Sequence, residues 1–99
     1  MIRHIVMMKL KDGLGRDDPG VVAAADALTA LGPALEPVRH WETHWCFGSR
    51  PVSNDFVLIC DVDDEAALQA YLTDPEHRKV AAGLAEHFVL SVADFSYAA

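Results

Sequence analysis

Four stretches of the chain predict β-strands, in which successive side chains point alternately to the two faces of a sheet. They cover residues 2–10, 38–48, 56–62 and 87–97. The first, third and fourth carry apolar residues on both faces, whereas a sheet with one face in water would show a polar residue at every second position. We therefore expect both faces of the sheet to be covered.

The stretch between the first two strands predicts a helix. A loop rich in Gly and Asp leads to Asp18 and Pro19, a helix-start signal, and Gly32 followed by Pro33 stops the helix. Apolar residues at helical spacing form its buried face: Val21, Val22, Ala25, Leu28 and Leu31.

Two further helices are predicted to meet at a corner near Asp74. The first carries Leu68, Tyr71 and Leu72 on one face, so Tyr71 is expected to point inward. The second begins at Asp74, whose carboxylate can accept from the free N–H groups of the next turn. Pro75 then occupies the first helical position, where its missing N–H costs nothing.

His77 lies in the first turn of that second helix. Val80, Ala81 and Leu84 follow it at spacings of three, four and seven, so the imidazole shares the apolar stripe and faces inward. The positive end of the helix dipole disfavours imidazolium and leaves the neutral form that a general base requires. Tyr71 and His77 are therefore a candidate proton-transfer pair. The structural alternative is that both fill a packing corner.

The first strand offers a third candidate. His4 shares a strand face with Val6 and Met8, and from there it would orient a substrate or His77. The alternative is a half-buried histidine whose hydrogen bonds are satisfied locally.

The second strand places two histidines and a carboxylate, His40, Glu42 and His44, on one face together with Val38 and Cys46. Such a set can bind iron or zinc. Residues two apart on a strand are about 6.5–7 Å apart, so three successive positions converge poorly on one ion. A solvated edge strand is the favoured interpretation, and no metal site is predicted.

The order of elements, β-α-β-β-α-α-β, predicts an α+β fold. It is the ferredoxin-like split βαβ arrangement with the second helix broken in two, which gives a four-stranded antiparallel sheet with helices on one face. The other apolar face needs a cover, and a second copy packed sheet to sheet would supply it and enclose a space between the sheets. A single domain of 99 residues has little area for a deep cavity, so a spacious ligand site is easier to build between two copies.

Composition narrows the partners. The chain is 52% hydrophobic and 23% charged, which is typical of a globular domain, and its formal charge is −7. The eight basic residues are scattered, which argues against nucleic acid and an anionic membrane as partners. No signal peptide or long apolar segment is present, so a cytoplasmic location is expected. Cys46 and Cys60 fit no metal spacing or disulfide framework and predict two buried thiols.

Three segments, MIRHIVMMKLKDG, DEAALQAYLTDPEH and VADF, together resemble the stress-responsive dimeric α/β-barrel family. The family signature has the form Y-x-x-H-P-x-H, and Asp74 stands here in place of its first histidine. The resemblance covers most of residues 1–99. It implies a homodimeric barrel of two four-stranded sheets with the helices outside, and a mostly apolar pocket in each protomer.

Within that family the chain is similar to polyketide cyclases of the olivetolic acid cyclase type, which work without a cofactor. The resemblance implies catalytic roles for Tyr71 and His77 and a pocket role for His4. Phe56 stands where those cyclases carry a further pocket histidine, so a different substrate is expected. The apolar, substrate-binding wall is predicted to comprise Val6, Met8, Trp41, Phe56, Leu58 and Leu90.

The sequence thus predicts a homodimer that binds a small apolar or polyketide-like ligand, with His77 removing an α-proton and Tyr71 donating to the developing enolate. Three alternatives remain open. They are a cofactor-independent monooxygenase of aromatic polyketides, a non-catalytic stress-response or apolar ligand-binding module, and a metal-dependent barrel that uses the His40 face.

Overall fold

The computed structural model describes residues 1–98. The elements follow the predicted order, with one short 3-10 helix added after the first helix. They are β1 (Ile2–Leu10), α1 (Pro19–Leu31), η1 (Gly32–Ala34), β2 (Val38–Trp45), β3 (Phe56–Val62), α2 (Glu65–Leu72), α3 (Pro75–His87) and β4 (Phe88–Ser96).

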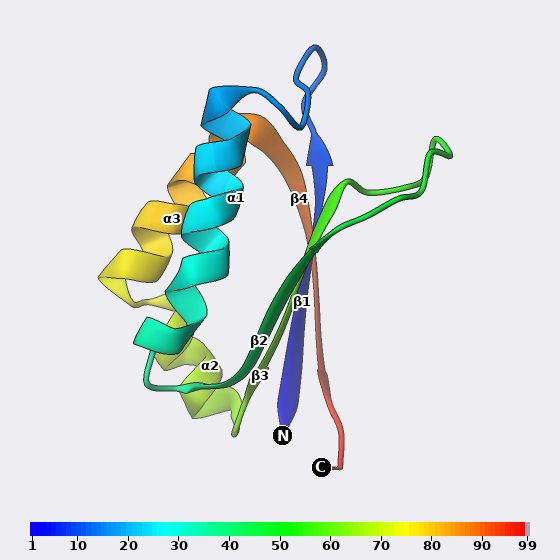
Figure 1. Ribbon diagram of the computed structural model, residues 1–99. Helices are drawn as coiled ribbons and strands as arrows, with labels where there is room; N and C mark the ends of the chain where they lie inside the picture. Colours follow the sequence, from blue (N-terminus) through cyan, green and yellow to red (C-terminus); the bar gives the residue numbers. More distant parts are fainter. Residues whose placement is uncertain (99) are drawn as a thin grey trace.

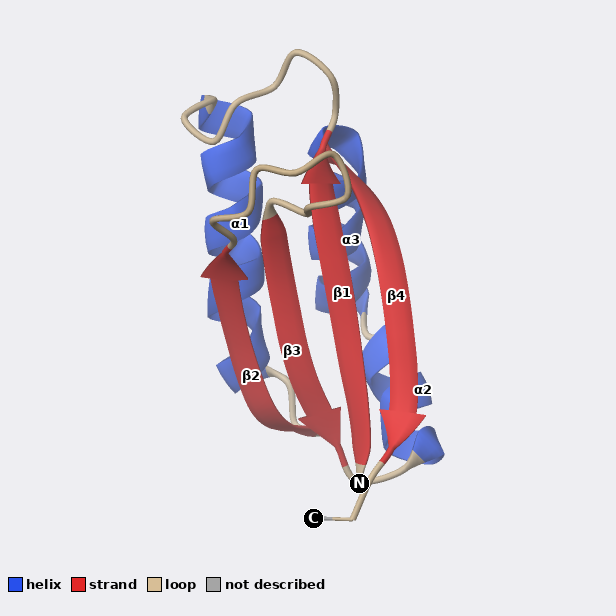
Figure 2. Ribbon diagram, turned by 90° about the vertical axis from the view of Figure 1, so that its right-hand side faces the viewer, coloured by secondary structure: helices blue, strands red, loops and turns tan. Residues whose placement is uncertain are grey.

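The strands form one antiparallel sheet in the order β2-β3-β1-β4. All three helices lie on one side of it, as Figure 1 shows edge-on, and Figure 2 looks directly at the face that they leave open. This is the predicted ferredoxin-like α+β architecture. Within residues 1–98 no helix combines the length and apolar character that crossing a bilayer requires.

The core lies between the sheet and the helices. Alternate residues of β1, from Ile2 to Met8, point toward the helices and are buried there, and His4 is among them. Val21, Leu28 and Leu84 of the helices pack against these β1 side chains. Burial of these apolar side chains on one shared layer is the main force that holds helices and sheet together.

The open face of the sheet is apolar as well. Ile5 of β1 pairs with Ile59 of β3 at its centre, and both are only half-buried. On β4, Val89 is 58% exposed and Phe95 is 46% exposed. One protomer therefore leaves a broad apolar sheet surface uncovered, as the alternation of the strands predicted.

The second strand departs from its predicted form in two ways. It ends at Trp45 because its partner strand begins only at Phe56, and one further backbone bond, from Cys46 N to Asp55 O, closes the ladder. A register shift between Val38 and His40 also turns Val38 toward the core. The prediction that Val38 shares a face with His40 was wrong, since a bulge inserts one extra residue and reverses the alternation.

Both cysteines are free thiols. Cys60 is fully buried on the helix side of β3, and burial raises its pKa to about 12. Cys46 is only half-buried, because it lies just beyond the end of β2, so the prediction of two buried thiols is confirmed for Cys60 alone.

Candidate functional site

The break between α2 and α3 brings Tyr71 and His77 together. Asp74 follows the end of α2 and starts α3: its N–H donates to Tyr71 O at 3.3 Å, and its carboxylate accepts from Glu76 N and His77 N at 2.8 and 3.3 Å. This cap fixes the first turn of α3. As a result the two rings lie 4.2 Å apart between centroids, inclined at 52°.

His4 reaches the same place from β1. Its ring lies 5.3 Å from that of Tyr71 in an edge-on arrangement, and it is almost completely buried. Its Nδ1 lies 2.5 Å from Oδ1 of Asp94, the residue opposite it in the β1–β4 register. A carboxylate only accepts, so Nδ1 of His4 carries the proton.

Asp94 was missed by the reasoning from sequence. A signal was present, because Asp94 follows Phe88, Leu90 and Val92 at every second position and therefore shares their strand face. Only the pairing of β4 with β1 shows that this carboxylate meets His4.

The three predicted catalytic residues line one cavity of about 130 Å³ between the sheet and the helices. All of its lining residues come from one protomer. Hydrophobic side chains make up the rest of its lining: Val6, Leu28, Leu58, Leu72, Ala81, Leu84, Leu90 and Val92.

The structure brings only part of the predicted apolar wall to this cavity. Val6, Leu58 and Leu90 line the cavity, whereas Met8, Phe56 and Trp41 do not. Met8 and Phe56 belong to the close-packed core next to Val6 and Leu58. There the Phe56 ring lies 6.3 Å from that of Phe88. Strand alternation gives the face of a residue but not its distance along the strand from the site, and so it could not separate the two groups.

Trp41 supports the site from behind. Its ring lies 6.0 Å from that of Tyr71, and its Nε1–H donates to Leu28 O at 3.0 Å. Gly32 makes room for it, because a Cβ on Gly32 would stand 2.1 Å from Cγ of Trp41. Trp41 therefore packs against Tyr71 outside the lining of the cavity.

Burial sets the protonation of the pair. It lowers the pKa of His77, with the nearby His4 acting in the same direction and the backbone of Leu72 against it. It also raises the pKa of the Tyr71 hydroxyl above its usual range. At neutral pH, Tyr71 keeps its proton and His77 is uncharged.

Two polar atoms of the site have no hydrogen-bond partner among the described residues, Tyr71 Oη and His77 Nδ1, and both are buried. A buried polar atom without a partner costs roughly 1–3 kcal/mol. Such groups, on two adjacent rings that line one cavity, can bind the polar end of a ligand: the hydroxyl donates, and a neutral imidazole nitrogen accepts or donates.

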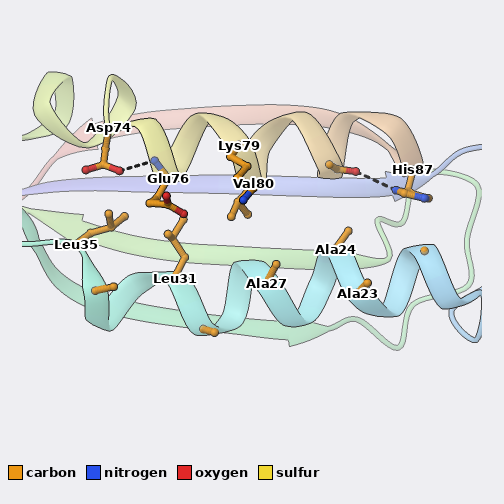
Figure 3. Close-up of a pocket in the computed structure, with 14 residues that line it drawn as sticks. Ala23, Ala24, Ala27, Leu31, Leu35, Asp74, Glu76, Lys79, Val80 and His87 are labelled. Atoms are coloured by element: carbon orange, nitrogen blue, oxygen red, sulfur yellow. Dashed lines mark hydrogen bonds between the residues drawn. The ribbon is translucent and has the colours of Figure 1, made fainter.

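A larger hollow lies elsewhere, in the open groove of about 700 Å³ between α1 and α3 (Figure 3). Short side chains, including Ala23, Ala27 and Val80, line it. Asp74 caps α3, Nδ1 of His87 bonds to Gly83 O at 2.9 Å, and the other charged residues of the lining, Glu76 and Lys79, are exposed to solvent. The groove is therefore not the candidate site despite its size.

The predicted second strand is an edge of the sheet, and its polar face is open to solvent. Glu42 lies between His40 and His44, with Oε2 at 3.5 and 3.7 Å from their Nε2 atoms. Among the described residues no three His, Cys, Asp or Glu side chains are arranged to hold a metal ion.

Residues 2–97 match the family model of the stress responsive A/B barrel domain. The chain belongs to this family. An uncharacterized protein of Streptomyces coelicolor is 42% identical over 97 residues, which is 98% of this chain and 100% of that protein. Solved structures of other proteins share the fold of this chain.

A dimeric ferredoxin-like protein of unknown function from Thermobifida fusca has a TM-score of 0.83 and 26% identity, over 97% of this chain and 90% of its own. A hydroxynitrile lyase from Passiflora edulis has a TM-score of 0.80 and 14% identity, over 95% of this chain and 90% of its own. The second likeness is one of fold alone.

Proposed function

We propose that this family member is a cofactor-independent acid–base enzyme that acts on a carbonyl compound, with His77 as the base and Tyr71 as the hydrogen-bond donor. One observation carries the proposal: two buried, unpartnered polar atoms of complementary character belong to adjacent rings that line one apolar cavity. Groups whose environment keeps them in the required protonation state are typical of catalytic sites.

In the proposed reaction, Nδ1 of His77 takes a proton from the carbon next to the carbonyl. The Tyr71 hydroxyl donates to the oxygen on which the enolate charge develops. The enolate carbon then forms a bond to a second carbonyl carbon, and His77 returns the proton to the new alkoxide. Run in reverse, the same steps cleave a carbon–carbon bond, so both cyclase and lyase chemistry of the aldol type are covered.

His4 acts in this scheme as a positioning residue. The Asp94 carboxylate accepts from its Nδ1–H and fixes the orientation of the ring. The edge-on contact with Tyr71 then keeps the phenol ring in place beside His77. Proton transfer of this kind contributes roughly 10²- to 10⁴-fold to a rate, so loss of either member of the pair is expected to be severe.

The working unit in this proposal is a homodimer. A second copy that covers the open sheet face would bury Ile5, Ile59, Val89 and Phe95. The loop after β2 projects on that same side, away from the helices (Figure 1), and its Phe47 is fully exposed. The Thermobifida fusca relative is dimeric, which supports the same assembly here.

The test is deuterium uptake from D₂O at the α-carbon of ketones, followed by NMR with a panel from cyclohexanone to extended β-keto chains. Wild-type protein should accelerate exchange of at least one ketone, and His77→Ala should abolish the acceleration. His87→Ala is the matched control, because His87 ends the same helix and lies outside the cavity. Equal exchange by wild type and His77→Ala for every ketone would remove His77 from catalysis.

A non-catalytic ligand-binding role is the second candidate, and the almost wholly apolar lining of the cavity favours it. In that case a ketone would bind in the cavity, but deuterium uptake at its α-carbon would not be accelerated.

A further inference from the structure

We infer that the ligand enclosed by this cavity is a small uncharged molecule, with a ring or branched body of about six to eight non-hydrogen atoms and a carbonyl end. An extended polyketide chain is excluded from it. The carbonyl end rests on the proposed function, whereas the size and the charge rest on the cavity itself.

Size is the first argument. The cavity holds about 130 Å³, and an apolar cavity of about 150 Å³ in another protein accommodates benzene. Its inner wall is made of Leu28, Leu58 and Leu84, which are at most 4% exposed and belong to the core. Because protein cores are close-packed, displacing these side chains to admit a longer ligand would be energetically costly.

The direction of entry is the second argument. Leu90 and Val92 are the exposed members of the lining, at 37% and 56%, and both lie on the edge strand β4. A ligand therefore enters beside β4. Asp94 stands next along that strand face, and its side chain is 40% exposed.

Charge is the third argument. No Lys or Arg is among the residues that line the cavity, and the carboxylate of Asp94 lies beside its entrance. A carboxylate or phosphate group placed inside would lose its water without gaining a counter-charge, which is strongly unfavourable. The ligand is therefore neutral, at least in the part that the cavity encloses.

The polar end of the ligand follows from the two unpartnered atoms. Tyr71 Oη supplies one donor, and His77 Nδ1 lies on the neighbouring ring 4.2 Å away. One carbonyl oxygen with an adjacent C–H satisfies the hydroxyl and presents its proton to the imidazole. Apart from His4, the rest of the lining offers only carbon.

The experiment measures binding of four probes by the shifts of Leu and Val methyl signals in NMR. Cyclohexanone should bind, and 2-decalone and cyclohexanecarboxylate should bind far more weakly or not at all. Tyr71→Phe should weaken cyclohexanone by about 2- to 10-fold while leaving methylcyclohexane unaffected, because only the ketone accepts the hydroxyl bond. Binding of decalone or of the carboxylate as tight as that of cyclohexanone would overturn the inference.

Two pairs of variants locate the binding. Ala81→Leu fills the cavity and should abolish cyclohexanone binding, whereas Ala82→Leu, exposed on the same helix, should not. Leu28→Ala enlarges the cavity and should admit 2-decalone. Cyclohexanone binding that survives Ala81→Leu would place the ligand elsewhere.

Binding and turnover separate the two proposals. Selective binding of cyclohexanone without accelerated exchange would leave the size and charge inference standing and end the catalytic proposal. Exchange that depends on His77 but occurs only with extended β-keto chains would do the reverse.

Discussion

Nδ1 of His4 lies 2.5 Å from the carboxylate of Asp94, across the pairing of the first and last strands of the chain. The ring of His4 is buried, whereas Asp94 is partly exposed. This contact links the candidate site to the edge of the sheet and fixes the orientation of the His4 ring.

The His4–Asp94 contact should be measurable as a coupling energy. In a double-mutant cycle of His4→Ala and Asp94→Ala, followed by urea unfolding, we expect a coupling of about 1 kcal/mol, reduced from that of a buried pair because Asp94 meets solvent. The exposed pair of Glu42 and His44, 3.7 Å apart, is the control and should give only a few tenths of a kcal/mol. Equal couplings would deny His4 and Asp94 any special role.

The burial of His77 predicts how stability depends on pH. Its pKa is held below the usual value near 6.5, so between the two pKa values the unfolded chain binds more protons than the folded one. The free energy of unfolding should therefore be highest above about pH 6.5 and fall as the pH is lowered through the folded pKa.

Urea unfolding at a series of pH values from about 7.5 to 5 checks this. His77→Gln should flatten the decrease, whereas substitution of the exposed His44 by Gln should leave it unchanged. The same decrease in wild type and His77→Gln would assign the titration to another group.

Gly32 should tolerate no side chain. Gly32→Ala places a methyl group in the space of the Trp41 ring, so Trp41 must move and lose its hydrogen bond to Leu28 O. We expect the free energy of unfolding to fall by roughly 1–3 kcal/mol. Because Trp41 packs behind Tyr71, ligand binding should weaken as well. Gly83→Ala is the control: its added Cβ meets nothing within 4 Å, so stability should hold or rise by up to about 1 kcal/mol. A neutral Gly32→Ala variant would show that Trp41 is free to shift.

The open sheet face should determine the oligomeric state. Ala93 is exposed in one protomer and pairs with Ile5 at the centre of that face. Ala93→Glu would place a charge in the proposed dimer interface, so sedimentation equilibrium at micromolar concentration should change from dimer to monomer. Ala82→Glu makes the same substitution on the exposed side of α3 and should remain dimeric. A wild-type monomer, or a dimeric Ala93→Glu variant, would exclude this face as the interface.

The sequence by itself determined the order of the elements, the two-sided apolar character of the sheet and the inward direction of Tyr71 and His77. These follow from side-chain periodicity and from the Asp74 cap, which are properties of neighbouring residues. Only the tertiary structure decided that Asp94 meets His4, that Trp41 packs behind the site, and that the cavity lies inside one protomer. Those features depend on the register between β1 and β4 and on the bulge in β2, which are set by packing between distant segments and leave little trace in local spacing.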